Sequence, residues 1–381
     1  MLNDDGTLPP QIHPLPRLLE LSVDQVLDSF IVSQRDDFTR VVAAVAMPGS
    51  SLHEVFAQFG GEPAEAAARL QHLFLDLHRH VMEHPVWRHP FFRRVFEGRV
   101  DAAQARRFSA QYFNQIKNTR QCVALAIGRF HGLAATAMGS EGERRSELTQ
   151  VALAQLVADE YGVGSHGLDD YPELGRLLGA KTHMVMYRQL FEGLGMSAAE
   201  QDVPMLPEVA DNVLIQRLVA GHEAFTPLEA LASVGLGMEW GVPEFFSLLL
   251  GGLIRVSERD RLGLTPHHLE VFIAHVRYDV LHAISVMLVT SLHMSEPDHL
   301  QVVKNACNML MTGRYAMMSG LYRHVFGEDC PGPAAIGLEP RHRVTDARLF
   351  QALRDARAKI APAQVIGGEA YARQADLPFE I

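Results

Sequence analysis

Apolar residues recur at helical spacing along most of this chain, whereas the strict alternation typical of strands is nearly absent. Between residues 63 and 82, for example, Leu70, Leu73 and Leu77 lie among charged residues at intervals that place them on one helix face. Turns marked by glycine or proline separate the helical stretches. Further helices are predicted over residues 101–127, 142–161, 182–194, 207–222, 226–238, 242–257, 266–293 and 297–325. The sequence therefore predicts an all-α protein folded as a helical bundle.

The chain divides into three predicted parts. Residues 1–75 comprise a proline-rich segment (1–16), which is expected to be extended, and helices that form a candidate dimerisation element. Residues 76–327 hold about seven core helices of the bundle. Residues 328–381 are predicted to form a Pro/Gly-rich linker, one helix near 345–359 and a polar tail.

Composition narrows the class of protein. Apolar residues make up 48% and charged residues 21% of the 381 residues, a balance that can bury a large core. The formal net charge is −11, from 34 Lys and Arg against 45 Asp and Glu. Since a phosphate-binding surface needs clustered positive charge, we expect no nucleic-acid partner.

Cysteine usage and hydropathy favour a soluble, cytoplasmic protein. Cys122, Cys307 and Cys330 lie far apart, so no disulfide framework is expected. The N-terminus has no basic flank followed by an apolar run, which argues against a signal peptide. The apolar windows 245–254 and 280–292 are too short, or too often interrupted by polar residues, to span a bilayer. They are predicted to be buried helices, and no membrane partner is expected.

The most informative motif contains His275, Asp279 and His282. On a helix, offsets of four and seven residues stay on one face, so these side chains point to one side of a largely apolar segment. Charged groups that face a core need a partner or a metal ion. The motif therefore indicates a metal site. The alternative interpretation is an aspartate that accepts hydrogen bonds from two half-buried histidines.

Three further residues become candidate ligands beside this motif. Glu239 is a carboxylate in the apolar stretch 234–250, whereas Glu244 lies out of phase with it and is expected to be solvated. Glu160 follows Asp159 at the end of a predicted helix, where acids are unfavourable unless a cation compensates the helix dipole. His183 begins another apolar helix.

Each of these residues also has a plainer interpretation. Glu239 could belong to an ordinary buried pair, and Asp159 and Glu160 could be solvated acids at a frayed helix end. His183 could be a hydrogen-bonded core histidine. His166 competes with His183 as the partner of Glu160, because it lies only six residues further along the chain.

Taken together, the candidates supply three carboxylates and three imidazoles. Hard oxygen ligands with borderline nitrogen ligands suit iron or manganese. No cysteine is among the candidate ligands, which disfavours a structural zinc site. Three carboxylates offset most of the charge of two divalent ions. Because helical bundles are known to hold two irons in this way, the residues predict a dinuclear site.

The order and spacing of these residues resemble those of the haem-oxygenase-like di-iron oxidases, which share a fold with the thiaminase-II and pyrroloquinoline-quinone synthase proteins. The resemblance covers about residues 80–327. Residues 159–162 (Asp-Glu-Tyr-Gly) are similar to the acidic motif of the family, His183 to the head of its Leu-Gly helix, and residues 275–282 to its closing motif. An insertion of about a dozen residues, 166–180, precedes His183 and is expected to form a short helix or lid.

The resemblance implies the ligand set and the cofactor. Two Fe(II) ions would be bound, with O2 as co-substrate. Glu160 and His183 would help to hold one iron, Glu239 would bridge the ions or lie between them, and the pair would be completed by His275, Asp279 and His282.

The resemblance also implies the reaction class and partners. Members of the family oxidise small amino acids or amines, and the chain most resembles the amine N-oxygenases in residues 159–162 and the N-terminal helices. A homodimer is expected, and an external electron donor is compatible with the chemistry. Candidate pocket residues, chosen because they neighbour the ligands or face inward, are Tyr112, Gln115, Tyr161, Met238 and Trp240.

Other functions remain open at this stage. The same site could cleave a C–C bond, decarboxylate oxidatively or desaturate its substrate. A metal-free bundle of the thiaminase-II type, or a non-catalytic helical protein, is the alternative from another class. The ligand set disfavours both, because a metal-free site has no reason to gather that charge.

Overall fold

The computed structural model describes residues 1–59, 62–163, 180–331, 340–374 and 376–377, with the side chains of residues 29–35 left out. These residues form helices and no β-strand, which confirms the predicted all-α class. The longer helices are α1 (Val23–Ala46), α3 (Pro63–Met82), α5 (Ala102–Ile127), α6 (Gly139–Glu160), α8 (His183–Gly193), α10 (Pro207–Gly221), α12 (Val242–Asp260), α13 (Glu270–Leu292) and α14 (His299–Phe326). Shorter elements are η1 (Leu18–Glu20), α2 (Ser51–Ala57), η2 (Pro85–Arg88), α4 (Pro90–Phe96), η3 (Ala135–Ala137), α9 (Ala198–Gln201), α11 (Pro227–Ala232) and η4 (Ser233–Glu239).

Local sequence explains where several of these helices begin. Asp101 and Gln104 form a reciprocal capping box at the start of α5. The side chain of Thr182 accepts a hydrogen bond from Val185 N and so caps α8. Two helices start later than their proline-marked turns predict. Residues 266–269 form a turn before α13 begins at Glu270, and α14 begins at His299.

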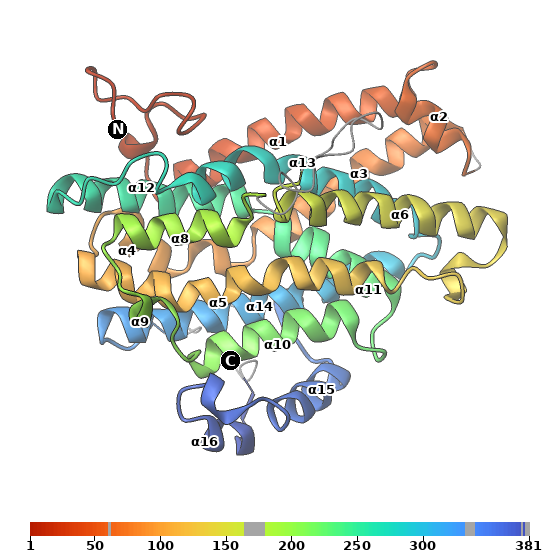
Figure 1. Ribbon diagram of the computed structural model, residues 1–381. Coiled ribbons are helices and arrows are strands. Elements are labelled where there is room, and N and C mark those ends of the chain that lie inside the picture. Colours follow the sequence, from red (N-terminus) through yellow and green to blue (C-terminus); the bar gives the residue numbers. More distant parts are fainter. Residues whose placement is uncertain (60–61, 164–179, 332–339, 375, 378–381) are drawn as a thin grey trace.

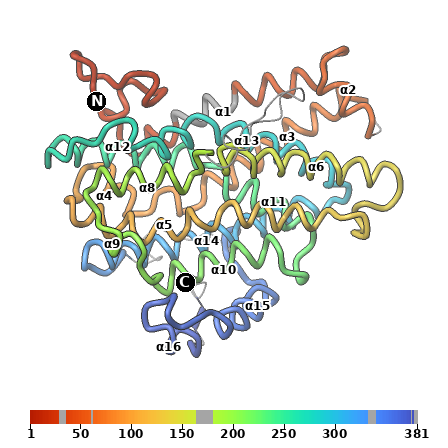
Figure 2. The backbone as a smooth tube through the Cα atoms, viewed as in Figure 1, coloured from red at the N-terminus to blue at the C-terminus, as the bar shows by residue number. Residues whose placement is uncertain are grey.

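The long helices form a layered bundle (Figure 1). α10 packs against α5 and α14, α12 packs against α13 and α4, and α1 lies on α3 and α12. The adjoining ends of α6 and α8 meet α13 near the middle of the bundle (Figure 2). Because α6, α8, η4 and α13 come from distant parts of the sequence, this meeting point can collect side chains that are far apart along the chain.

The N-terminal segment differs from the extended conformation predicted for it. Ile12 N and His13 N both donate to the carbonyl of Pro9, so the chain turns there. Leu8, Ile12 and His13 are buried, and His13 Nε2 lies 2.8 Å from Ser247 Oγ on α12. The prediction was wrong because proline favours turns as well as extended chain, and the two buried apolar side chains hold this segment on the bundle.

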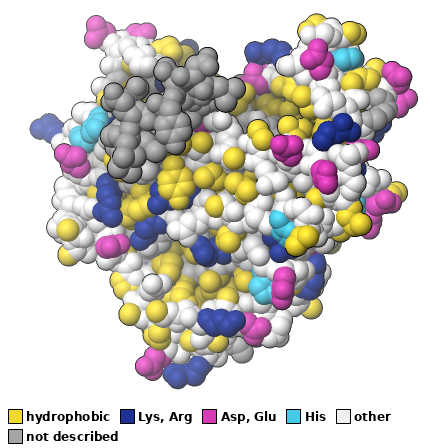
Figure 3. Space-filling model, turned by 45° about the vertical axis from the view of Figure 1, so that its right-hand side comes forward, with side chains coloured by type: hydrophobic (Ala, Val, Ile, Leu, Met, Phe, Trp, Pro, Cys, Tyr) yellow, Lys and Arg dark blue, Asp and Glu magenta, His cyan; other side chains and the backbone are white. Residues whose placement is uncertain are grey.

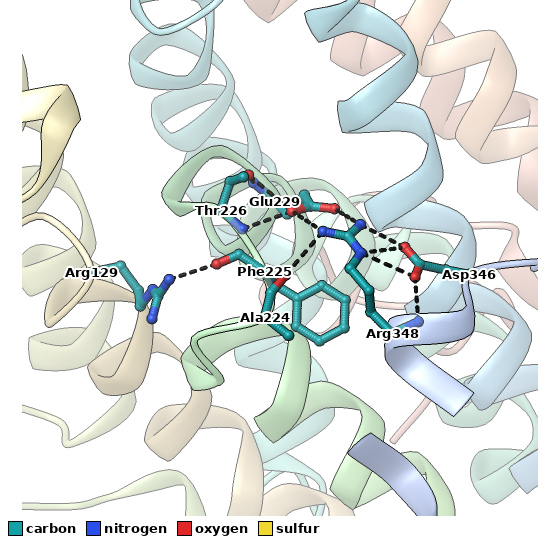
Figure 4. Close-up of polar contacts among 7 residues, drawn as sticks. All are labelled: Arg129, Ala224, Phe225, Thr226, Glu229, Asp346 and Arg348. Carbon is teal, nitrogen blue, oxygen red and sulfur yellow. Dashed lines mark hydrogen bonds and ion pairs between the residues drawn. The ribbon is translucent and has the colours of Figure 1, made fainter. Parts of the chain in front are cut away.

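The C-terminal segment is attached to the bundle by an ion pair and hydrogen bonds. After residues 332–339, which are not described, the structure shows four elements: η6 (Pro340–His342), α15 (Ala347–Arg357), η7 (Pro362–Gln364) and α16 (Gly368–Arg373). α15 lies where the sequence predicts one helix, and α16 lies within the expected tail. Arg348 donates to Glu229, at 2.6 Å, and to the carbonyl of Ala224, at 2.9 Å, with Asp346 beside it (Figure 4). Glu229 also belongs to the capping box of α11, so this contact ties α15 to a helix end of the bundle.

α13 is long and apolar enough to cross a membrane by length and composition. In the bundle, 67% of its most apolar 18-residue window is buried. A core helix has these properties because apolar residues surround it on most sides. On the face of the molecule in Figure 3, acidic and basic side chains are interspersed among hydrophobic ones.

Candidate metal centre

Two clusters of ligand-type side chains lie in the middle of the bundle. The first cluster is Glu160, His183 and His275, and the second cluster is Glu239, Asp279 and His282. In each cluster, one potential ligand atom of every residue lies within 4.8 Å of the other two. The six side chains are at most 9% exposed. The structure thus brings together all six residues that the sequence singles out, and α13 supplies members of both clusters.

The first cluster forms where α6 ends and α8 begins. Glu160 is the last residue of α6 and His183 is the first residue of α8. His183 Nδ1 lies 3.0 Å from Glu160 Oε1, and the rings of His183 and His275 are 4.5 Å apart. Gly162 has a φ of 69°, and a Cβ atom there would lie 2.4 Å from the carbonyl oxygen of Lys181. Only glycine therefore allows the chain after Glu160 to pass so close to the chain before His183.

The second cluster depends on an irregular turn. Glu239 is the last residue of η4, a π-helical turn that follows α11. The sequence predicts one continuous helix over 226–238 instead. π-turns inside helices occur often at functional sites, because the wider turn changes the direction of the side chains after it. Here it leaves Glu239 beside α13, where His282 Nδ1 lies 3.4 Å from Asp279 Oδ1 and 3.9 Å from Glu239 Oε2.

Neighbouring hydrogen bonds fix which nitrogen atom of two histidines is available. His275 Nδ1 lies 2.6 Å from the carbonyl oxygen of Val271, so Nδ1 carries the proton and Nε2 is left for a ligand. His282 Nε2 lies 3.0 Å from Asp159 Oδ2, which leaves Nδ1 facing the second cluster. A carboxylate or carbonyl behind the imidazole is the usual support of a metal-binding histidine.

Burial and neighbouring charges shift the pKa values of several residues in the two clusters. Burial would raise the pKa of Glu160, but the contact with His183 and the charges of His275 and His282 outweigh burial and lower that pKa to about 2. Burial, together with the charge of Asp279, raises the pKa of Glu239 well above its ordinary value. Burial would lower the pKa of His282, but contacts with Asp159 and Asp279 outweigh it and raise that pKa to about 11.

The residues fit divalent metal ions. Asp279 Oδ2 is buried and makes no hydrogen bond, and the buried Nδ1 atoms of His183 and His282 face carboxylates without good hydrogen-bond angles. Such atoms are costly in a core unless a ligand satisfies them. Each cluster offers carboxylate oxygen and imidazole nitrogen, the donor set that suits iron and manganese. The two clusters also influence each other, since the charge of His282 in the second cluster acts on Glu160 in the first.

The grouping of the ligands differs in detail from the arrangement that the family resemblance implies. His275 lies with Glu160 and His183, whereas Asp279 and His282 lie with Glu239. Asp279 also acts electrostatically on His183 and His275. Asp279 therefore lies at least as close to both clusters, in its electrostatic effects, as the sequence-based prediction expected of Glu239.

One residue near the site contradicts its prediction, and one acquires a role that the sequence did not reveal. Glu244 is fully buried rather than solvated. It lies in the first turn of α12, where the helix dipole favours a negative charge. Asp159 holds His282 instead of ending a frayed helix. Its place next to Glu160 was the only sequence feature that could have revealed this.

Three of the five candidate pocket residues are buried near the clusters. Tyr112 is buried, and its pKa is raised by burial and by the charges of Asp279 and Glu239, so it neighbours the site. Trp240 is buried and donates from Nε1 to His78 Nδ1 at 3.0 Å. Met238 is buried within η4, next to Glu239.

Two of the predicted pocket residues do not face the buried clusters. Gln115 belongs to an amide network, in which it donates to Gln216 and accepts from Asn212, both at 2.7 Å. Tyr161 is 39% exposed, and the guanidinium group of Arg120 lies 4.6 Å from its ring centre. His166 and most of the insertion before His183 lie outside the described residues.

Cavities of different size lie near the two clusters. Beside the first cluster, a pocket of about 440 Å³ is lined by Tyr161 and Thr182, which adjoin Glu160 and His183, among others. A cavity of about 10 Å³, roughly the size that holds one water molecule, is lined by Glu239, Trp240 and Asp279 among others. A much larger groove of about 1110 Å³ lies between α2, α3 and α6, and none of the six cluster residues lines it. The six cluster side chains are thus buried and lie apart from this groove.

Comparisons with known proteins add little to the geometry. No family model matches the chain, and no curated protein matches it. The crystal structure of a TenA homolog from Pseudomonas syringae pv. tomato is similar, with a TM-score of 0.47 and 9% sequence identity. The match covers 68% of this chain and 92% of that chain. A TM-score below 0.5 supports no inference, so the function has to be argued from the site itself.

Proposed function

We propose that this protein is a non-haem di-iron oxidase that uses O2 to oxidise a small amino acid or amine, with N-oxygenation of an amine as the favoured reaction. The observation that carries the proposal is the pair of buried clusters, each with carboxylate and imidazole donors. The donor types favour iron over zinc or magnesium. The resemblance of residues 159–162 to the amine N-oxygenases favours that reaction.

The chain's own residues would prepare the site for this chemistry. When bound, two ferrous ions would supply the activation of O2. The carbonyl of Val271 holds the proton of His275 on Nδ1, and Asp159 holds that of His282 on Nε2. Phe246 stacks on His275 with ring centres 4.3 Å apart. These contacts restrict both imidazoles before a metal arrives, and burial of the six side chains limits the access of water to the reacting groups.

A metal-free function is the principal alternative. It would leave Glu160, Glu239 and Asp279 buried in one small region, where only His183 and His282, whose pKa values these acids raise, could balance them. Burial of several carboxylates is costly unless they are neutralised. We therefore favour a metalloenzyme over a metal-free activity of the thiaminase-II type or a non-catalytic role. The homodimer, the external electron donor and the cytoplasmic location stay predictions.

Metal analysis tests the proposal most directly. Protein loaded anaerobically with ferrous iron should retain about two irons per chain. Glu239→Ala and His282→Ala should each reduce iron content and abolish turnover while the helical circular dichroism persists. Glu244→Gln serves as a control, because Glu244 is also a buried carboxylate but lies outside both clusters. Stoichiometric zinc, the absence of any bound metal, or full activity in both variants would contradict the proposal.

A mass-spectrometric screen then distinguishes the reactions. Amino acids and amines are incubated with the ferrous protein and 18O2. A product heavier by one labelled oxygen atom on nitrogen supports N-oxygenation. Loss of carbon dioxide or of a carbon unit indicates cleavage, and loss of two hydrogen atoms indicates desaturation.

A further inference from the structure

Arg314 is a buried cation that is not used by the proposed metal site. It lies on α14 and is only 6% exposed. Its Nη2 donates to the carbonyl of Met238 at 3.1 Å, and its Nη1 is buried without a hydrogen-bond partner. Among the described residues, no carboxylate forms an ion pair with it. A buried guanidinium group in this situation is costly, because burial removes its hydration and little replaces it.

The surroundings of Arg314 orient the group but do not neutralise it. The guanidinium carbon lies 5.6 Å from the ring centre of Trp87 and 6.0 Å from that of Phe245. Aromatic faces attract cations weakly and hold the planar group in place. Burial lowers the pKa of Arg314, and the neighbouring Tyr112 and Glu239 offset that effect only in part.

Glu239 is not available to balance Arg314 if the proposed function holds. Two divalent ions carry more positive charge than Glu160, Glu239 and Asp279 together neutralise. The charge of Glu239 is then engaged by metal, and Arg314 faces the metal site as an uncompensated cation. This step rests on the proposed function.

We propose that Arg314 binds the carboxylate of the substrate, which makes the substrate class amino acids rather than simple amines. The planar fork of a guanidinium group binds carboxylates in two parallel hydrogen bonds, and Nη1 still has hydrogen-bonding capacity. Arg314 donates to the carbonyl of Met238, the residue immediately before Glu239. A carboxylate on Arg314 therefore lies within the length of one small molecule from the second cluster.

Tyr112 supports the same placement. The charges of Arg314, Asp279 and Glu239 all act on its phenol, so Tyr112 neighbours the cation as well as the second cluster. A substrate held by its carboxylate at Arg314 would pass this ring and present its amine to the metal site. The contact of Arg314 with Met238 O has a competing explanation, namely that Arg314 only positions η4 and with it Glu239.

Binding of 13C-labelled formate, observed by NMR under anaerobic conditions, tests the proposal without turnover. Formate is small enough to enter a narrow site and carries the carboxylate alone. Both metal-free and ferrous protein should bind it saturably, and Arg314→Gln should weaken binding about 10- to 100-fold, as expected for loss of a hydrogen-bonded charge. Arg314→Lys should be intermediate, because it keeps the charge but loses the fork. Formamide, which is neutral, should not compete.

Controls separate this proposal from the others. Arg107→Gln is the matched variant, because Arg107 also donates to one backbone carbonyl, that of Val325, but lies on the surface. It should bind formate as the wild type does. Unchanged formate affinity in Arg314→Gln, or no saturable binding by the folded wild type in either metal state, overturns the proposal. Loss of iron from Arg314→Gln with unchanged formate affinity identifies a positioning role instead.

The iron content of the wild type is measured separately from formate binding. Absence of iron refutes the di-iron proposal, and the formate affinities of the metal-free wild type and Arg314→Gln still decide whether Arg314 binds carboxylate.

Discussion

At the end of α6, the adjacent acidic residues Asp159 and Glu160 contact different clusters. Glu160 faces His183 in the first cluster, whereas Asp159 reaches His282 in the second cluster. Asp159 is itself held by Gln155, whose Nε2 donates to Asp159 Oδ1 at 2.9 Å. One helix end therefore serves both clusters, once with a candidate ligand and once with a carboxylate that orients a ligand.

Asp159→Asn should weaken metal binding without unfolding the protein. Loss of the carboxylate behind a metal-binding histidine typically lowers metal affinity about 10- to 100-fold. Competition of the metal-free protein with a calibrated chelator measures the change. Glu147→Gln, an exposed acid on the same helix, should leave the affinity unchanged. An unaltered affinity in Asp159→Asn would mean that Asp159 does not support His282.

Sequence spacing could identify the six cluster residues but not how they divide. Offsets of four and seven residues predict one common face for His275, Asp279 and His282, and the three side chains do point into the same region. The division between two clusters depends on where α6 and η4 meet α13, which is a matter of tertiary packing. The prediction for Glu244 is wrong because Trp240 is extended and Gly241 is left-handed, so no regular helix relates Glu244 to Glu239.

At the scale of elements, the π-turn η4 is the feature that sequence periodicity could not reveal. Its apolar residues continue the pattern of α11, so the sequence predicts one helix. Close packing accompanies the irregular turn. A Cβ atom on Gly235 would lie 1.9 Å from Val286 Cγ1 on α13, so the backbone of η4 touches the helix that bears three candidate ligands. Most of the other helices obey simple rules of periodicity and capping, and could be predicted.

Gly235→Ala should destabilise the protein by about 1–3 kcal/mol, because an added methyl group overpacks the contact with α13. Val286→Ala makes room at the same point. The double variant should therefore be less destabilised than the sum of the two single variants. Urea unfolding of the four proteins measures this coupling, and additive effects would show that the two side chains do not meet.

At the scale of the whole molecule, both terminal segments are anchored by pairs of polar groups that no sequence pattern predicts. Arg357 on α15 forms a buried ion pair with Asp211 on α10, at 2.6 Å, and Tyr371 on α16 donates to the same carboxylate at 2.7 Å. At the other end, His13 contacts Ser247. Contacts over such distances along the chain leave no local pattern, so the docking of both ends could not be predicted.

Arg357→Ala should destabilise the protein by about 3–5 kcal/mol, since Asp211 would remain buried without its cation. Arg373→Ala is the matched control, because Arg373 also lies in the C-terminal segment but pairs with Glu369 on the surface. Thermal unfolding measures both variants. Equal, small effects would indicate that the C-terminal segment is not anchored through Asp211.

Stability should fall in mild acid because several histidines are buried as neutral groups. Burial, with the charge of Arg145, lowers the pKa of His293 from 6.5 to about 4. The unfolded chain therefore binds this proton more readily, and the contribution of His293 to stability is lost as pH falls from about 6.5 to 4. His293→Gln should remove about 2–3 kcal/mol of the pH dependence over this window. Parallel pH profiles of the two proteins, measured by urea unfolding, would refute this assignment.

Because α13 bears residues of both clusters, it restricts where insertions and deletions can be accommodated. One inserted residue inside a helix rotates everything after it by about 100°. A single insertion between His275 and Asp279 would therefore turn the two clusters away from each other, and no loop could correct the error. The connection between Glu160 and His183 has no such restriction, because only its two ends have to meet. Related chains should thus tolerate insertions and deletions there, while the spacing from His275 to His282 stays fixed.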